Sequence, residues 1–369
     1  MSRRIYLKMK SLKEAQDIFL THWNLGEMLS AETVATGDAA GRVCAAPVFA
    51  RFSSPTFHSA AMDGISVRAE RTFGARPESP LELRIGTEAR WINTGQPMPG
   101  DADAVIMVEN IHQIEANRVE IQAAAYPWQN VRKVGEDIVA TELLLPQNHQ
   151  INACDVGALL AAGVLELQVY RRPKVLIIPT GNELVEAEEL RGKEKVPAGA
   201  IVEFNSWVLA NLVRQWGGKC ERHPIIPDDP ALLRRELLDG VAGSYDVIIV
   251  NAGSSAGSED YTANLIAELG EVLVHGVAIM PGKPTVLGDI SGKPVIGNPG
   301  YPVSAVISME QFVRPLLYRM QGLQEPEPEM VEAYPAQKIP SKLGVEEFLR
   351  VNIGRVGVRL VATPLARGA

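Results

Sequence analysis

The chain of 369 residues is 46% hydrophobic and 22% charged, a balance typical of folded globular protein, and its length favours two to four domains. The formal net charge of −8 gives no long-range attraction for nucleic acid, so we expect no nucleic-acid partner. No stretch approaches the roughly 20 apolar residues that cross a bilayer, and the basic N-terminus leads into no apolar run, so we expect a cytoplasmic protein with no membrane partner.

The cysteines allow a further exclusion. Cys44, Cys154 and Cys220 lie far apart, and no pair has the spacing of metal ligands. We therefore expect all three to be reduced and buried, in a reducing compartment. The histidines are also scattered, so the sequence does not favour a structural zinc site.

The N-terminal part mixes helical and extended patterns. Ser11 and Glu14 have the spacing of a capping box, which predicts the start of a helix that runs to Gly26. Residues 31–51 combine short apolar segments with a Gly-Arg pair, so we expect a helix and an extended stretch there.

Residues 52–129 have β character. Short alternating runs, such as 81–85 and 119–121, are broken by Gly, Pro and Asn, which predicts a small β domain. A short helix over 156–163 and a strand over 165–170 follow.

From residue 173 the pattern changes to that of an α/β domain. Val175–Ile178 is an apolar run of the kind that is buried on both faces of a parallel sheet. Further strands and helices alternate with it, which predicts a doubly wound α/β domain over 173–322. We expect strands at 246–250 and 295–297, and helices at 205–216, 232–238, 262–269 and 302–320.

The end of the chain again has β character. Residues 324–329 form a polar linker pattern, and alternation returns at 348–353 and 356–361. Because this remainder is short for a domain, we expect an incomplete C-terminal β domain over 328–369.

Ligands of an open parallel sheet bind in the crevice beyond the carboxyl ends of its strands, and four loops are expected there. The first, residues 180–184, directly follows the strand at 174–179. Gly181, which follows Thr180, permits a tight turn, and Glu183 brings a carboxylate near the crevice. The alternative is an ordinary turn with a solvated glutamate.

The second loop, residues 251–260, offers backbone amides and hydroxyls to phosphate oxygens, and its Asp260 could hold Mg²⁺. It lacks the Lys-Ser/Thr ending of a P-loop, so it is not a Walker A motif. A flexible surface loop is the alternative. The small and hydroxyl residues expected to contact the ligand are Gly253, Ser255 and Gly257.

The third and fourth loops offer donors to an oxyanion. In residues 281–284 two prolines fix a turn that presents Lys283, although a plain turn with an exposed lysine has the same pattern. In residues 298–304 Pro302 stands where a helix begins, so free amides and the Ser304 hydroxyl are expected to point toward the crevice. The alternative is a well-formed helix start with no ligand.

Taken in order, these segments resemble the molybdopterin molybdenumtransferase family (the MoeA-type proteins and the gephyrin E domain), and the resemblance runs over almost the whole chain. Two further segments, around Asp63 and Thr94, are ordinary turns by composition and gain meaning only from this resemblance. The landmarks are residues 60–64, 93–95, 100–105, 134–137, 180–184, 255–260, 281–284 and 299–304, together with Asn205 and Asp228.

The resemblance implies an elongated homodimer with four domains per chain. Residues 1–51 and 130–172 would form an elongated N-terminal α+β linker and dimerisation domain, and residues 52–129 a small β domain. Residues 173–322 would form the molybdopterin-binding α/β domain, and residues 328–369 part of the C-terminal β domain.

The resemblance also implies an activity. Family members insert molybdate (or tungstate) into adenylylated molybdopterin and release AMP with Mg²⁺, at a site between the α/β domain of one subunit and the small domain of the other. By position, Mg²⁺ would be held by Glu183, Asp228 and Asp260, and Asp63 would come from the partner subunit. The oxyanion would be held by Lys283, Ser304 and Arg350, the last following Glu347-Phe348-Leu349. The other substrate-binding positions are Thr94, Thr180, Gly181, Asn205, Gly253, Ser255, Gly257, Pro299 and Gly300.

Several positions depart from the family pattern. The usual Thr-Gly-Gly-Val-Ser stands here as residues 251–255, and the usual Leu-Pro-Gly-Asn-Pro as residues 298–302, so that Tyr301 replaces an Asn. Ala60 replaces a Ser, and Met280 replaces a Lys that many members carry. The C-terminal domain ends before a family Ser near molybdate, so we expect a truncated form of a longer, divergent paralogue.

Two alternatives stay open. A non-catalytic module that senses or carries the cofactor would bind a pterin without releasing AMP, and Met280, Tyr301 and the early end favour it. A CinA-like nucleotide-processing enzyme would reuse the same α/β domain, but the resemblance of the N-terminal segments counts against it.

Overall fold

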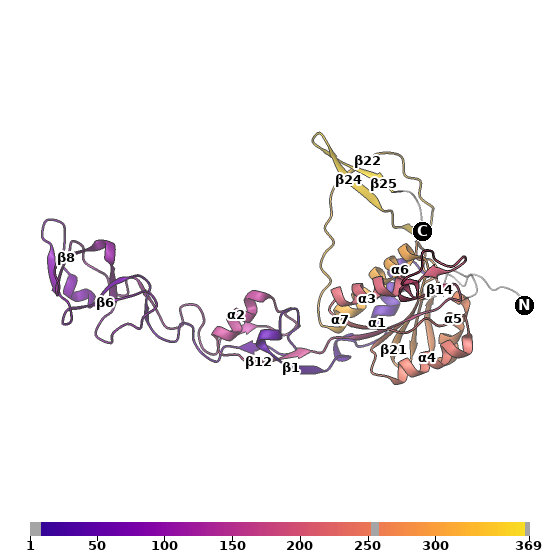
Figure 1. Cartoon of the computed structure of the whole chain (residues 1–369), viewed down its shortest axis with the longest axis horizontal. Helices are drawn as coiled ribbons and strands as arrows, with labels where there is room; N and C mark the ends of the chain where they lie inside the picture. The colour runs from indigo at the N-terminus through magenta and orange to yellow at the C-terminus, as the bar shows by residue number, and fades with distance from the viewer. Residues whose placement is uncertain (1–8, 252–257, 366–369) are drawn as a thin grey trace, which may run out of the picture. The chain divides into compact units, whose positions relative to one another are not determined.

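The computed structural model describes residues 9–251 and 258–365, with the backbone alone for 258–260. The chain divides into two compact units (Figure 1). The first unit comprises Met1–Glu32 and Tyr170–Ala369, and the second comprises Thr33–Val169.

A six-stranded sheet forms the centre of the first unit, in the order β16-β13-β17-β21-β20-β18. Strands β16, β13, β17 and β21 are parallel to one another, whereas β20 is antiparallel to both of its neighbours, β21 and β18. The strands are β13 (Lys174–Pro179), β16 (Lys219–Arg222), β17 (Val247–Asn251), β18 (Glu271–His275), β20 (Val286–Ile290) and β21 (Lys293–Asn298). The predicted strands at 174–179, 246–250 and 295–297 are thus confirmed, whereas the other three had not been expected.

Helices cover both faces of this sheet, and Figure 1 shows α4 on the opposite side from α3 and α7. The helices are α1 (Leu12–Thr21), α3 (Asn205–Gln215), α4 (Pro230–Ala242), α5 (Ser258–Leu269), α6 (Pro302–Ser308) and α7 (Arg314–Met320). A π-helical turn, Met309–Val313, joins α6 to α7 without a break. Pro315 follows this turn and has no N–H to donate. The Gln311 carbonyl accepts instead from the side chain of Gln16 in α1, at 3.0 Å.

The two faces of β13 serve two separate hydrophobic cores. Val175 and Ile177 pack in the cluster that contains α1, α3 and α7, and Leu176 and Ile178 in the cluster that contains α4 and α5. All four side chains are buried. The prediction of a strand buried on both faces is confirmed.

Helix α1 begins with the predicted capping box. Ser11 N–H donates to the Glu14 carboxylate at 2.9 Å, and Glu14 N–H donates to Ser11 Oγ at 3.3 Å. The helix ends at Thr21, earlier than the predicted Gly26. Its buried Phe19 meets Phe312 edge to face, so the start of the chain packs against the α/β sheet.

The second unit is built mainly from short strands around a core of their inward side chains. It contains two three-stranded sheets, β6-β4-β7 and β5-β9-β8. Their strands are β4 (Gly64–Val67), β5 (Leu81–Arg84), β6 (Ala89–Ile92), β7 (Ala104–Met107), β8 (Ile111–Glu115) and β9 (Arg118–Ile121). The predicted strands at 81–85 and 119–121 are confirmed as β5 and β9.

Two strand pairs and one helix complete this unit, and a third pair, β1 with β12, includes the chain positions at which the two units divide. The pairs are β1 (Ala31–Ala35) with β12 (Glu166–Tyr170), β2 (Val48–Phe49) with β11 (Leu143–Leu145), and β3 (Ser59–Ala60) with β10 (Val131–Arg132). Helix α2 spans Ala153–Ala161. The helix expected within 31–51 is wrong beyond the single 3₁₀ turn η2 (Thr36–Asp38), because pairing with β12 keeps β1 extended. The other 3₁₀ turns are η1 (Leu25–Glu27), η3 (Ala69–Thr72), η4 (Val108–Asn110) and η5 (Ala187–Leu190).

The C-terminal segment forms a small sheet of its own, in the order β22-β25-β24. Its hairpin turns at Gly357, which has a positive φ of 59°, so both strands lie a few residues beyond the predicted positions. One more pair, β19 with β23, joins this segment to the residues before the 281–284 turn. The remaining strands are β14 (Leu184–Val185), β15 (Ile201–Val202), β19 (Ile279–Met280), β22 (Tyr334–Pro335), β23 (Glu346–Glu347), β24 (Val351–Val356) and β25 (Arg359–Pro364).

Two expectations from composition concern the cysteines and membrane-spanning segments. Cys44 is buried and Cys220 half-buried, but Cys154 is exposed in the first turn of α2, so the expectation of three buried thiols is wrong for that residue. Burial raises the pKa of Cys220 to about 12. None of the described helices has the length and apolar character needed to span a membrane.

Candidate active site in the crevice of the sheet

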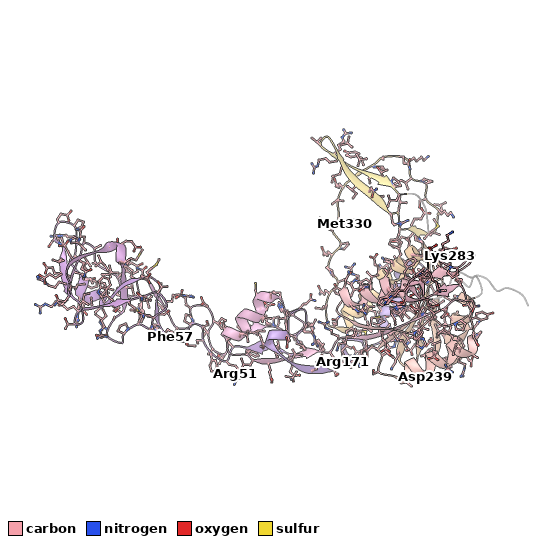
Figure 2. The ribbon with its side chains drawn as sticks, viewed as in Figure 1. Arg51, Phe57, Arg171, Asp239, Lys283 and Met330 are labelled. Carbon is pink, nitrogen blue, oxygen red and sulfur yellow. The ribbon has the colours of Figure 1, made fainter. Side chains whose placement is uncertain are left out.

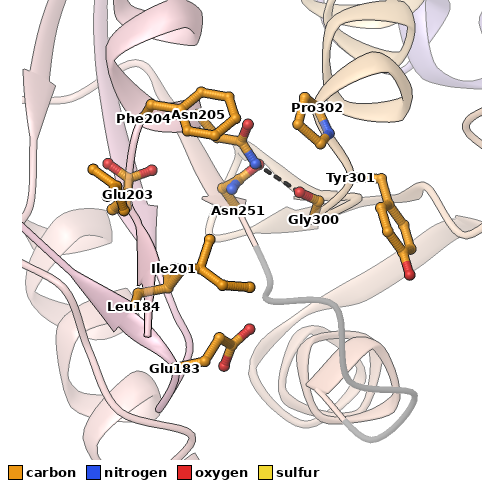
Figure 3. Close-up of a pocket in the computed structure, with 11 residues that line it drawn as sticks. Glu183, Leu184, Ile201, Glu203, Phe204, Asn205, Asn251, Gly300, Tyr301 and Pro302 are labelled. Atoms are coloured by element: carbon orange, nitrogen blue, oxygen red, sulfur yellow. Dashed lines mark hydrogen bonds between the residues drawn. The ribbon is translucent and has the colours of Figure 1, made fainter. Parts of the chain in front are cut away.

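A cavity of about 130 Å³ lies beyond the carboxyl ends of β13, β17 and β21, where ligands of open α/β sheets bind. We call it the crevice pocket (Figure 3). Its walls come from the β14–β15 pair, the end of β17 and the starts of α3 and α6. The lining residues are Glu183, Leu184, Ile201, Val202, Glu203, Phe204, Asn205, Asn251, Gly300, Tyr301 and Pro302.

The loop after β13 places Glu183 at this pocket. Thr180 is buried, and its N–H donates to the Asn251 carbonyl at 3.0 Å. A Cβ on Gly181 would lie 3.0 Å from Glu183 Oε2, so the carboxylate packs over the glycine. The absence of a side chain at Gly181 therefore leaves room for Glu183.

The same loop holds Asp228. Asp228 N–H donates to Asn182 Oδ1 at 3.1 Å, which ties the loop after β13 to the segment before α4. Asp228 Oδ1 is buried, and within residues 9–251 and 258–365 no hydrogen-bond partner reaches it. Asp228 lines a smaller cavity with Thr180 and with Tyr261, which follows Asp260 in α5.

These carboxylates suit a hard divalent cation. Oxygen ligands are the ones that Mg²⁺ prefers, and an unpartnered buried carboxylate oxygen is costly unless a cation or donor meets it. No cluster of three His, Cys, Asp or Glu side chains placed to hold a metal occurs in the described part of the chain. Of the proposed ligands, the Asp260 side chain lies outside the described residues, as do Gly253, Ser255 and Gly257.

The residues expected to hold an oxyanion lie on segments that the fold brings together. A Cβ on Gly282 would lie 2.7 Å from Ile279 Cδ1 and 3.8 Å from the Ser304 carbonyl oxygen, so the 281–284 turn packs against the start of α6. Ser304 is buried. Lys283, labelled in Figure 2, is exposed.

Strand β23 lies beside β19, with Phe348 N–H donating to the Met280 carbonyl at 2.9 Å. The exposed Arg350 follows two residues later. Its segment therefore lies next to the residues that lead into the turn carrying Lys283.

The fourth loop contacts α3. Asn205 Nδ2 donates to the Gly300 carbonyl at 2.6 Å. Pro299, which precedes Gly300 in the chain, is buried. Asn205, which we had expected at the site by position alone, therefore holds the loop that begins α6.

In the second unit, Asp63 and Thr94 contact each other directly. Thr94 N–H and Oγ1–H donate to Asp63 Oδ1 at 2.7 and 3.0 Å. The backbone donor, followed by the hydroxyl, holds the pKa of the exposed Asp63 carboxyl below its usual value. A Cβ on the neighbouring Gly64 would lie 1.9 Å from the Ile106 carbonyl oxygen, so only glycine fits there.

Sequence reasoning missed a buried charged network beside the crevice pocket. Glu203 is only 2% exposed and accepts from Ser206 N–H, Ser206 Oγ–H and the Arg222 guanidinium, the last at 3.0 Å. Arg222 also pairs with Glu186 at 3.3 Å and stacks 4.0 Å from the Trp207 ring centre. The spacing of Glu203 and Ser206 resembles a helix cap, but nothing in the sequence indicated Arg222.

Asn251 and Asn298, which both depart from the family pattern, contact each other. Asn298 Nδ2 donates to Asn251 Oδ1 at 3.2 Å. Asn298 is 2% exposed, and its Oδ1 has no partner among the described residues. The two substitutions therefore form one buried amide pair at the carboxyl ends of β17 and β21.

Comparison with known proteins agrees with this geometry. The family model described as MoeA N-terminal region (domain I and II) matches residues 10–163, and the model described as probable molybdopterin binding domain matches residues 176–319. Molybdopterin molybdenumtransferase 2 of Mycobacterium tuberculosis is 33% identical over 369 residues, covering 93% of this chain and 87% of that protein. The chain belongs to the molybdopterin molybdenumtransferase family.

Other members of this family agree. Molybdopterin molybdenumtransferase of a Nostoc species is 32% identical over 338 residues, covering 86% of this chain and 76% of that one. The solved structure of a molybdopterin biosynthesis MoeA protein from Pyrococcus horikoshii superposes with a TM-score of 0.80 at 32% identity, covering 98% of this chain and 90% of that one. The expected multidomain α/β fold class is confirmed.

Proposed function

We propose that this chain is a molybdopterin molybdenumtransferase of molybdenum cofactor biosynthesis. It inserts molybdate or tungstate into adenylylated molybdopterin and releases AMP in a Mg²⁺-dependent reaction, in the cytoplasm and as a homodimer. Family membership over nearly the whole chain supports the reaction class. The observation that carries the site is that the loop after β13 contributes Glu183 to the crevice pocket and holds Asp228 at a second, smaller cavity.

The carboxylates carry the metal in this proposal. Glu183, Asp228 and Asp260 would hold Mg²⁺, and the bound ion would supply positive charge that offsets the charge of a pyrophosphate. The side-chain oxygen of Asn182 accepts a hydrogen bond from the backbone N–H of Asp228 and so orients that residue. Gly181 leaves room for Glu183. Asp260 occupies the first turn of α5, where the helix dipole also favours a bound anion.

The cations and hydroxyls hold the oxyanion. Lys283, Ser304 and Arg350 bind molybdate or the terminal phosphate, since charge-assisted donors suit a tetrahedral oxyanion. Thr180, Asn205 and Gly300 shape the floor on which the phosphate rests. The remaining substrate contacts in this proposal are made by Gly181, Gly253, Ser255, Gly257 and Pro299.

Asp63 and Thr94 belong to the partner subunit's side of the site. Asp63 is exposed and ionised over a wide pH range because Thr94 donates to it twice. One carboxylate oxygen, Oδ1, accepts both of these bonds, which fixes the orientation of the group toward a ligand.

A second candidate is a cofactor-binding protein without catalysis. Met280 removes a cation from the segment that leads to Lys283, and Tyr301 replaces an amide in the crevice pocket. This candidate binds the pterin but releases no AMP. The CinA-like alternative is not retained, because the family extends over residues 10–163.

The decisive measurement is AMP release from adenylylated molybdopterin with Mg²⁺ and either molybdate or tungstate. We expect metal-dependent release, and a rate about 100-fold or more lower in Asp260→Ala, the scale for loss of one group that stabilises transition-state charge. Asp239→Ala, which alters an exposed carboxylate in α4, is the matched control and should keep the full rate. Pterin binding without AMP release by the unaltered chain would refute the insertase and leave the binding protein.

A further inference from the structure

The crevice pocket carries two aromatic side chains that the proposed reaction does not use. Phe204 is 46% exposed and Tyr301 is 53% exposed, and both line the pocket (Figure 3). Across residues 9–251 and 258–365, neither ring packs on another aromatic ring or under a cation. About half of each residue is therefore accessible at the pocket.

A hydrogen bond fixes the spacing of the two residues. Phe204 is followed by Asn205, and Tyr301 is preceded by Gly300, and these two neighbours are joined by the 2.6 Å bond from Asn205 Nδ2 to the Gly300 carbonyl. Figure 3 shows the two rings on either side of this bond. Each residue is the N-cap of a helix, α3 or α6, yet neither side chain makes a capping hydrogen bond.

The rest of the pocket has the composition of a site for a flat, partly polar ring. Ile201, 48% exposed, and Leu184 add apolar surface. Glu183 and Asn251 add polar groups from the loops after β13 and β17. Apolar walls with a few convergent polar groups are typical of sites for heteroaromatic ligands, and exposed rings bind such ligands by stacking.

We propose that Phe204 and Tyr301 form a stacking site for a planar heteroaromatic ring of the substrate. The inference rests on the proposed function for the identity of that ring, which is either the pterin or the adenine of adenylylated molybdopterin. Stacking by Tyr301 is a property of this chain, because the family usually carries an Asn there.

The test measures equilibrium binding, separately from AMP release. The full chain is titrated with 6-hydroxymethylpterin, followed by its fluorescence, and with AMP, followed by calorimetry. We expect Phe204→Ala and Tyr301→Asn each to weaken binding of one of these probes about tenfold, the loss expected when a stacking ring is removed. Tyr301→Phe, which keeps the ring, should retain the affinity.

The control is Phe73→Ala, which removes an exposed ring outside the pocket and should leave binding and melting temperature unchanged. A loss confined to the pterin identifies the pterin as the stacked ring, and a loss confined to AMP identifies the adenine. Unchanged affinity for both probes in the two truncated variants overturns the stacking site, as does failure of the unaltered chain to bind either probe. AMP release by that same chain would then still support the insertase, so the two proposals fail independently.

Discussion

Asp63 illustrates how two hydrogen bonds from one residue lower the pKa of a proposed site residue. Thr94 donates to Asp63 Oδ1 through its backbone N–H and its hydroxyl, and both bonds favour the ionised carboxylate. Its depressed pKa gives a contribution to stability that is present above the pKa of the unfolded chain and is lost as the pH falls through the folded value.

Thr94→Ala removes the hydroxyl donor and keeps the backbone donor. We expect the pKa of Asp63 to rise in this variant but to stay below its ordinary value, because the backbone bond is the larger cause of the shift. The pKa is measured from the carboxyl carbon resonance of Asp63 during a pH titration. Thr87→Ala, an exposed threonine in the same unit, should leave the titration unchanged. A pKa that is unaltered in Thr94→Ala would show that the hydroxyl bond is not made in solution.

At the scale of elements, the β14–β15 pair depends on a charge network. The pair forms one wall of the crevice pocket, and Arg222 in β16 connects Glu186, just after β14, with Glu203, just after β15. Glu203 is buried and would keep only the Ser206 donors without Arg222. The free energy of unfolding of this unit should therefore be sensitive to Arg222.

We expect Arg222→Ala to lower the free energy of unfolding by about 3–5 kcal/mol, because it leaves a buried carboxylate without its cation. Arg234→Ala breaks an exposed ion pair with Glu268 in the same unit and should cost no more than about 1 kcal/mol. Both values come from urea unfolding followed by circular dichroism. Replacing Glu203 and Arg222 together by methionine should recover most of the loss, and equal costs for the two arginine variants would mean that the network contributes little.

At the scale of the whole molecule, our proposal shares the site between two subunits. Asp63 belongs to one compact unit, and Glu183 and Asp228 belong to the other. If one subunit supplies Asp63 and its partner supplies the carboxylates, then two inactive variants can restore one intact site when they share a dimer.

We expect Asp63→Ala and Asp228→Ala to be inactive when each is assayed alone. Unfolded together and refolded as a mixture, the two variants should recover about a quarter of the AMP release of the unaltered protein. Half of randomly formed dimers are mixed, and each mixed dimer has one intact site of two. The same variants refolded separately and then combined serve as the control for exchange of subunits. Light scattering at the assay concentration should give the mass of a dimer. An inactive mixture of confirmed heterodimers would mean that each site is built within one chain.

Part of this structure follows from local sequence alone. The run Val175–Ile178 predicts a strand buried on both faces because every one of its side chains is apolar. The Ser11–Glu14 spacing predicts a helix start because both capping bonds close within one turn. Strand β16, Lys-Cys-Glu-Arg, lacks such a signal and was missed, since its place at the edge of the sheet relaxes the need for apolar residues.

The candidate site divides in the same way. Sequence order and family resemblance determined which residues to consider, from Asp63 to Arg350. Tertiary structure alone decided that Asn182 holds Asp228, that Arg222 neutralises Glu203, and that Asn251 pairs with Asn298. These contacts join residues 19 to 47 positions apart, and the order and register of the strands determine which segments meet. Local sequence fixes what a segment can form, but packing among distant segments decides which side chains touch.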